Sequence, residues 1–308
     1  MIYSHSRLST FEQCPFKFKL RYIDEIVPEI EQTIESHLGK SVHETLEWLY
    51  KKVIKEKKVA TITELIDQYT EAWSNSFTPE IKIVRRNLTA KDYFSKGVKF
   101  LIDYYIKHKP FEDGTIELEK RILVKLDKEE KYKIQGFVDR IVKNPRTGEY
   151  EIHDYKTANT LPTKEKIDCD RQLALYSIGI KETFNTTKNV NLVWHYLAHN
   201  TKIISKRTNE QLEQLKKDII QLIKKIELTT EFPTYTSVLC DWCEYKSMCP
   251  AFGGKPLERQ TKIEHHVKKK EIVKETKSED NETEEEIKKQ LEEEIKDESI
   301  KPEGLDIY

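Results

Sequence analysis

The spacing of apolar residues in this chain changes near residue 112, and this change limits the folds open to it. From Gly39 to about Lys109, apolar residues recur at helical spacing. After Gly114 they alternate with polar residues in three runs, "TIELEKRILVKL", "YKIQGFVDRIVK" and "EYEIHDYKT". The pattern predicts a helical region followed by three strands, joined as hairpins by turns at 127–131 and 144–148.

The remaining segments extend this order on both sides. Residues 6–23 predict a capped helix that is interrupted at Cys14-Pro15. After the hairpins we expect a helix at 164–184, strands at 190–198 and 202–207, and a helix at 210–228. An alternation of this kind indicates an α/β protein with a central mixed sheet flanked by helices.

Residues 256–308 differ in composition from the rest of the chain. They hold 17 acidic and 11 basic residues and almost no aromatic ones, so we expect a charged, disordered tail. Because the whole chain has a net charge of −1, residues 1–255 carry +5. A mildly basic folded part is compatible with nucleic-acid binding and equally with a solvated charged surface.

The sequence contains no membrane or nucleotide-binding signal. No apolar run approaches the roughly 20 residues that span a bilayer, and "MIYSHSRLST" lacks the apolar core of a signal peptide, so we expect a cytoplasmic protein without membrane contact. Gly39-Lys40-Ser41 resembles the end of a phosphate-binding loop, but Ile34 stands where that motif needs glycine. We therefore expect no ATPase activity in this chain.

Candidate catalytic residues lie on the predicted hairpins. Asp154 and Lys156 are two positions apart on one strand, so their side chains project from the same face. Asp139 lies on the neighbouring strand, and two carboxylates on adjacent strands suit Mg²⁺ or Mn²⁺. A lysine beside them suits the positioning of a water molecule. The alternative is ordinary cross-strand pairing of charges on a solvated face.

Four short motifs follow one another along the chain: Gly-x-x-x-His-Glu at 39–44, Gly-Phe-Val-Asp-Arg at 136–140, Asp-Tyr-Lys-Thr at 154–157 and Gln-x-x-x-Tyr at 172–176. In this order the set resembles the PD-(D/E)XK nuclease superfamily, in particular its RecB/AddB-like and CRISPR-adaptation exonuclease branch.

The resemblance implies a role for each matching residue. His43, Asp139, Asp154 and the backbone carbonyl of Tyr155 would be metal ligands. Lys156 would assist the attacking water, and Gln172 with Tyr176 would hold the DNA strand or orient the site. Asp154 stands where many members have glutamate, which bears on metal preference. We interpret three further acids as solvated charges and leave them out of the site: Glu44, Glu117 and Glu119.

Four of the five cysteines are candidate metal ligands. A compact C-x2-C-x5-C cluster is formed by Cys240, Cys243 and Cys249. Cys14 is the best candidate for a fourth ligand. We interpret Cys169 as a free cysteine. Four thiolates suit structural Zn²⁺ or a [4Fe–4S] cluster, and spacing alone does not separate them. Members of the same nuclease branch hold a [4Fe–4S] cluster with one cysteine before the nuclease domain and three after it, so the resemblance favours the cluster, with zinc as the alternative.

The resemblance implies a restriction-endonuclease-like core with a helical insertion and closure by the four-cysteine iron–sulfur site. The expected divisions are an N-terminal segment with the first cysteine, a helical insertion with His43, the nuclease core, the three-cysteine segment and the tail: 1–30, 31–112, 113–232, 233–255 and 256–308.

The expected activity is that of a metal-dependent exonuclease on single-stranded DNA ends, in repair, recombination or CRISPR adaptation. A helicase or a CRISPR integration complex is the expected partner. The alternative is a catalytically silent DNA-binding or scaffold subunit, whose signature would be a missing ligand or lysine.

Overall fold

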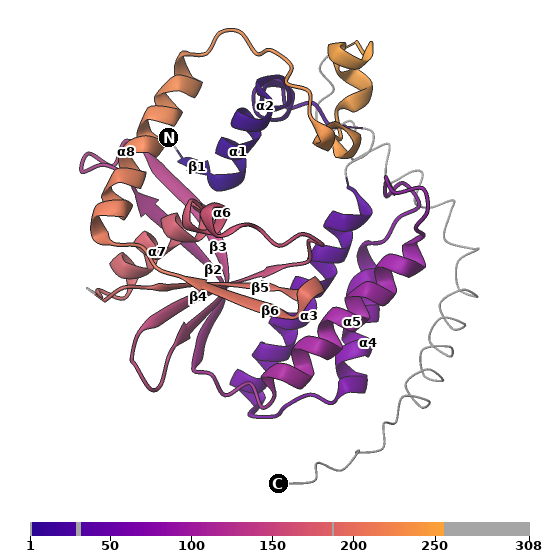
Figure 1. Ribbon diagram of the computed structural model, residues 1–308, viewed down its shortest axis with the longest axis vertical. Coiled ribbons are helices and arrows are strands. Elements are labelled where there is room, and N and C mark those ends of the chain that lie inside the picture. The colour runs from indigo at the N-terminus through magenta and orange to yellow at the C-terminus, as the bar shows by residue number, and fades with distance from the viewer. Residues whose placement is uncertain (1, 29–31, 187, 256–308) are drawn as a thin grey trace. The chain divides into compact units, whose positions relative to one another are not determined.

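The computed structural model describes residues 2–28, 32–186 and 188–255, and within them six strands form one mixed sheet (Figure 1). The order across the sheet is β1-β3-β4-β5-β6, and β2 pairs with β3. The strands are β1 (Ile2–Ser4), β2 (Thr115–Lys125), β3 (Lys133–Lys143), β4 (Tyr150–Lys156), β5 (Asn191–Tyr196) and β6 (Thr201–Ser205).

The predicted hairpins are present. Strands β2 and β3 pair antiparallel, as do β3 and β4, with turns at the two expected places. Strand β5 then runs parallel to β4, and β6 returns antiparallel to β5. A parallel pair needs a crossover connection, which here passes through helices, so the sheet is mixed as the sequence predicts. Strand β1, which pairs parallel with β3, was not predicted because three residues are too short for a periodic signal.

The eight α-helices of the described residues follow the predicted order with more breaks than expected. They are α1 (His5–Gln13), α2 (Pro15–Tyr22), α3 (Ile34–Glu56), α4 (Ile62–Ser76), α5 (Ala90–His108), α6 (Lys164–Asp168), α7 (Gln172–Thr183) and α8 (Asn209–Leu228). The predicted helix at 164–184 is therefore two helices, α6 and α7. The predicted helical region at 39–109 is three, with a non-helical stretch at 77–89.

Side-chain caps explain several of these boundaries. Thr61, Thr89 and Thr208 each accept a hydrogen bond from the backbone at the third helical position, and the residue there bonds back to the capping residue's own N–H. Such capping boxes satisfy N–H groups that have no partner within the helix. At Cys14-Pro15 the chain is extended and proline starts the next helix, which is the predicted interruption between α1 and α2.

Helices cover both faces of the sheet (Figure 1). The main hydrophobic core joins the strands to α1, α2, α7 and α8. On the other face, α3 and α5 bring Tyr50 and Tyr104 to the strand residues Arg140 and Tyr155. Strands β3 and β4 thus lie between two helical layers, which keeps their side chains fixed.

By their internal contacts, the described residues up to Asp24 and from Pro28 onward form one compact unit. The charged tail predicted at 256–308 lies outside the described residues. No helix in the described part of the chain combines the length and the hydropathy that crossing a bilayer requires.

Candidate active site

The β3–β4 ladder ends beside the predicted carboxylates. The last backbone pair is Arg140 with His153, so the same register would place Asp139 opposite Asp154. At this position the backbone N–H of Tyr155 donates to the Oδ2 atom of the Asp139 side chain over 3.1 Å. This bond fixes the Asp139 side chain against strand β4.

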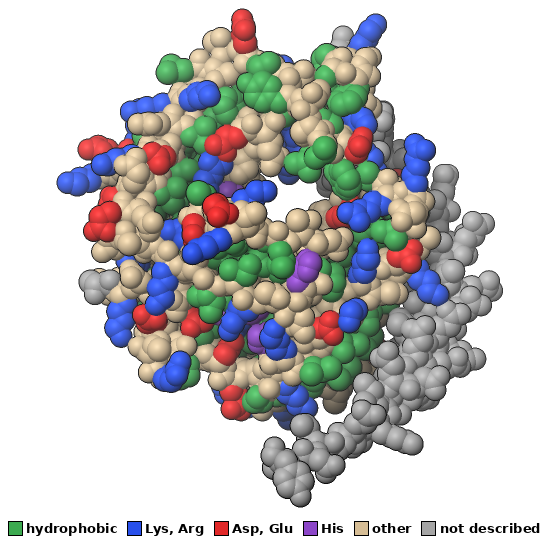
Figure 2. All heavy atoms as spheres, in the orientation of Figure 1, with side chains coloured by type: hydrophobic (Ala, Val, Ile, Leu, Met, Phe, Trp, Pro, Cys, Tyr) green, Lys and Arg blue, Asp and Glu red, His purple; other side chains and the backbone are tan. Residues whose placement is uncertain are grey.

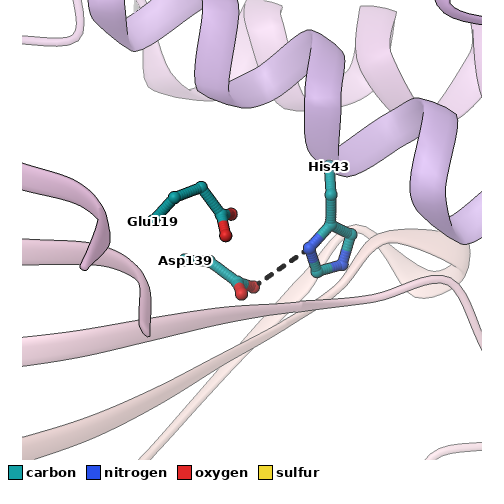
Figure 3. A group of neighbouring side chains, drawn as sticks. All are labelled: His43, Glu119 and Asp139. Carbon is teal, nitrogen blue, oxygen red and sulfur yellow. Dashed lines mark ion pairs between the residues drawn. The ribbon is translucent and has the colours of Figure 1, made fainter. Parts of the chain in front are cut away.

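His43 reaches this place from helix α3 (Figure 3). Its Nδ1 atom lies 3.2 Å from Oδ2 of Asp139, and its Nε2–H donates to the backbone carbonyl of Tyr155 over 2.8 Å. Burial by itself would lower the pKa of His43, but the hydrogen bond and charge of Asp139, together with the charge of Asp154, raise the pKa to about 9. In the absence of a cation, His43 is therefore a proton-bearing group between two oxygens.

The buried Asp154 and the half-buried Lys156 form an ion pair on one face of β4. Oδ2 of Asp154 lies 2.7 Å from Nζ of Lys156, and Asp154 is only 5% exposed. Burial and the nearby charge of Asp139 raise the pKa of Asp154 to about 6, although Lys156 opposes this shift. Burial lowers the pKa of Lys156, but Asp154 outweighs it and the pKa is raised, so Lys156 stays an ammonium group.

Gln172 and Tyr176 lie one turn apart on α7, as the sequence predicts. Oε1 of Gln172 lies 3.5 Å from Nζ of Lys156. The ring of Tyr176 occupies the space where residue 136 has no side chain, since a Cβ atom at Gly136 would lie 2.3 Å from the Tyr176 hydroxyl oxygen. The glycine in the Gly-Phe-Val-Asp-Arg motif therefore makes room for the tyrosine of the Gln-x-x-x-Tyr motif.

Glu119, which we interpreted as a solvated charge, lies in this site. The pairs Leu118–Arg140 and Lys120–Val138 flank it, so its register partner on β3 is Asp139. Ligand atoms of His43, Glu119 and Asp139 all lie within 4.8 Å of one another, and the three side chains converge (Figure 3). Burial and then the charges of Asp139 and Glu47 raise the pKa of Glu119 to about 7.

The structure thus assembles a set that differs from the predicted metal ligands. His43, Asp139 and the Tyr155 carbonyl meet as predicted, Glu119 joins them, and Asp154 lies beside them in its pair with Lys156. The excluded acids Glu44 and Glu117 are not members of the group.

An open cleft of about 510 Å³ beside the first half of α3 is lined by His43, Glu119 and Asp139. One imidazole and two carboxylates that converge in a cleft fit a divalent cation.

A sequence model of the PD-(D/E)XK nuclease superfamily matches residues 2–250. The chain belongs to this superfamily. Membership identifies it as a nuclease, a class of hydrolase.

Two solved structures are also similar to this chain. That of SSO0001 has 18% identity and a TM-score of 0.35, covering 80% of this chain and 96% of that one. A protein from Eubacterium rectale, provisionally named an exonuclease, has 13% identity and a TM-score of 0.45, with 84% and 91% covered.

The nuclease holds strands β3 and β4 in place through a buried arginine that follows Asp139. Arg140 is fully buried, and each of its five N–H donors has a partner. Nε donates to the Tyr155 hydroxyl over 2.8 Å, and the other donors reach Asp113, Thr115 (3.0 Å), Tyr104 (3.3 Å) and His153 (2.7 Å). Its guanidinium also lies 4.2 Å from the ring centre of Tyr50. A fully satisfied buried network of this kind specifies one arrangement of the strands.

The four predicted cluster cysteines of the nuclease line one small cavity of about 60 Å³. Cys14 is thus brought beside Cys240, Cys243 and Cys249 from the opposite end of the sequence, whereas Cys169 lies exposed and outside this cavity. Contacts around the cavity join α2 to the three-cysteine segment, with a salt bridge of 2.8 Å between Lys17 and Glu244. Four thiols around one cavity fit a thiolate-bound metal group.

Proposed function

We propose that this nuclease is a divalent-metal-dependent deoxyribonuclease that works as an exonuclease on single-stranded DNA ends. The observation that carries the proposal is the meeting of His43, Asp139 and the Tyr155 carbonyl beside the Asp154–Lys156 pair. Mg²⁺ or Mn²⁺ is the expected ion, because carboxylate and carbonyl oxygens are the ligands that these ions prefer. When bound, the ion would polarise a phosphate oxygen and stabilise the charge that develops during hydrolysis.

Lys156 supplies a fixed hydrogen-bond donor at the site. Its raised pKa keeps the amine protonated, so it donates to a water or a phosphate oxygen and does not remove a proton. Asp154 holds the ammonium group from one side and Gln172 from another. A donor held in this way is preorganised for the charge of the transition state, because its orientation does not have to change during the reaction.

Tyr176 is buried in the core with its ring against Gly136, so we propose that it orients the site through its hydrogen bond to Gln172. An opening is visible between α1 and α2, α3 and the three-cysteine segment (Figure 2), and it offers an unpaired strand a path past the site. This opening supports single-stranded DNA as the substrate.

We further propose that Cys14, Cys240, Cys243 and Cys249 hold a [4Fe–4S] cluster with a structural role. All four cysteines line one small cavity, which supports a common thiolate-bound group. Four thiolates suit zinc as well, so zinc stays the alternative. The group would join the N-terminal helices to the end of the folded chain.

The proposal is tested with the full chain, purified without oxygen. Linear single-stranded DNA labelled at either end, and circular single-stranded DNA of the same sequence, are incubated with Mg²⁺, Mn²⁺ or EDTA. An exonuclease degrades the linear strands only and releases label progressively from one end. Cleavage of the circle would identify an endonuclease, and binding without cleavage would support the silent subunit. The pathway and the helicase or integration-complex partner stay predictions.

A further inference from the structure

We propose that Glu119 is a metal ligand of this site and that strand β2 supplies it through an unusual backbone conformation. The inference rests on the proposed function, since it assigns an additional residue to the same divalent cation. It concerns a residue outside all four sequence motifs of the chain.

The first observation is the backbone at Glu119. Its φ angle is +46°, in the left-handed region, although the residue lies within the eleven-residue strand β2. A side chain other than glycine adopts this region at an energetic cost, and a residue held there inside a strand suggests a functional constraint. The neighbouring pairs Leu118–Arg140 and Lys120–Val138 keep the same register on both sides, so the distortion is confined to one residue.

The second observation is the position of the side chain. Glu119 faces its register partner Asp139, and its carboxylate lies within 4.8 Å of ligand atoms on both His43 and Asp139 (Figure 3). It lines the cleft of about 510 Å³ together with them. Glutamate reaches farther than aspartate, so a cation in this cleft would have one oxygen ligand from each of two adjacent strands and one nitrogen ligand from α3.

The third observation is that the neighbouring cation does not neutralise Glu119. Lys120 pairs instead with Glu117, at 3.1 Å. Glu117 therefore has the role of an ordinary surface acid, whereas Glu119 turns its charge toward His43 and Asp139. The two glutamates, two positions apart on one strand, form a matched pair for an experiment.

The ligand set also indicates which ion is preferred. One imidazole nitrogen with two carboxylates suits Mn²⁺ better than Ca²⁺ or Mg²⁺, because imidazole favours transition ions and carboxylates accept both classes. We therefore expect the site to bind Mn²⁺ in the absence of DNA.

The test measures Mn²⁺ binding to the full chain without nucleic acid. The concentration of free Mn²⁺ is determined by electron paramagnetic resonance. Four proteins are compared: the parent, Glu119→Gln, Glu117→Gln and Asp139→Asn. We expect Glu119→Gln to weaken Mn²⁺ binding by about tenfold or more, as the loss of a ligand does, and Glu117→Gln to leave the affinity within about twofold of the parent. Equal binding by Glu119→Gln and the parent, with binding lost in Asp139→Asn, would overturn the assignment of Glu119 while leaving the metal site intact. A parent that neither binds Mn²⁺ nor cleaves DNA would overturn the proposed function as well.

A second variant separates the ligand from the backbone. Glu119→Gly removes the carboxylate and also the cost of the left-handed conformation, so we expect a higher melting temperature together with weaker Mn²⁺ binding. Lower thermal stability with unchanged Mn²⁺ affinity would show that Glu119 has only a structural role.

Discussion

The imidazole of His43 in helix α3 bonds to the backbone carbonyl of Tyr155 in strand β4, with Nε2 2.8 Å from the oxygen. A helix from the first third of the chain is thereby joined to the strand that carries Asp154 and Lys156. Because the next residue along β3 from Asp139 is the buried Arg140, which bonds to the Tyr155 hydroxyl, both the backbone and the side chain of Tyr155 are held. The geometry of the site therefore depends on residues that never reach the cleft.

Replacing Arg140 is expected to destabilise the fold strongly. Arg140→Gln leaves the hydroxyls of Tyr155 and Tyr104 without their buried donor, and each buried polar group without a partner costs about 1–3 kcal/mol. Urea denaturation measures this loss. Arg146→Gln is the matched control, since Arg146 is exposed, and it should change the unfolding free energy by less than about 0.5 kcal/mol. Similar stability of the two variants would contradict the network's structural role.

Gly136→Ala is expected to displace the ring of Tyr176. The added methyl group would lie 2.3 Å from ring atoms, so either the ring or strand β3 has to move, at a cost of about 1–3 kcal/mol. The clash requires the ring, and for this reason Gly136→Ala should cost much less in a Tyr176→Ala background. A double-mutant cycle on unfolding free energies measures the coupling, and strictly additive effects would refute the contact. Gly39→Ala serves as control, because its Cβ would meet only Thr157, at 3.4 Å.

Acid is expected to destabilise the protein through His37. Burial, followed by the charge of Lys40, lowers the pKa of His37 to about 4. The unfolded chain takes up this proton near pH 6.5 and the folded chain only near pH 4, so stability is present above pH 6.5 and is lost as the pH falls toward 4. Unfolding free energies at several pH values should fall less steeply for His37→Phe, whose ring suits the contacts with Trp73 and Phe77. An unchanged pH slope would exclude His37 as the cause.

Removal of one cluster cysteine is expected to release the whole metal group. Cys14→Ser, purified without oxygen, should contain no iron or sulfide. Its melting temperature should be lower, because the N-terminal helices are no longer joined to the three-cysteine segment. Cys169→Ser should keep iron and sulfide, since Cys169 lies exposed and outside the cavity. Zinc in place of iron and sulfide in the parent protein would favour the alternative metal.

The hairpins could be predicted from sequence because they depend on local spacing, and alternation places Asp154 and Lys156 on one face. The break at Cys14-Pro15 follows from proline, which starts the next helix. The roles of His43, Gln172 and Tyr176 come from the resemblance and stay predictions. Strand β1 and the break between α6 and α7 could not be predicted, since they depend on partners that are distant in the sequence.

Alternation along the strand does not predict the position of Glu119 in the site. The turn centred on Glu129 places Glu119 and Asp139 at equal distances on either side, so the register alone pairs them. Alternation along a regular strand, however, carries no sign of the left-handed residue at this position. A count of residues from the turn would have found the pair, whereas the convergence of Glu119 with His43 requires the packing of α3 on the sheet.

The central claim is tested most directly by comparing DNA cleavage by the parent chain and by Lys156→Met, which keeps the length of the side chain but removes its charge. Lys52→Met, at a lysine paired with Glu64 outside the site, serves as control. With Mn²⁺ and end-labelled single-stranded DNA, the account predicts degradation by the parent and the control, a loss of at least about 100-fold in Lys156→Met, and retained DNA binding by all three. Cleavage by Lys156→Met at the parent's rate would contradict the assignment of this edge of the sheet as the active site.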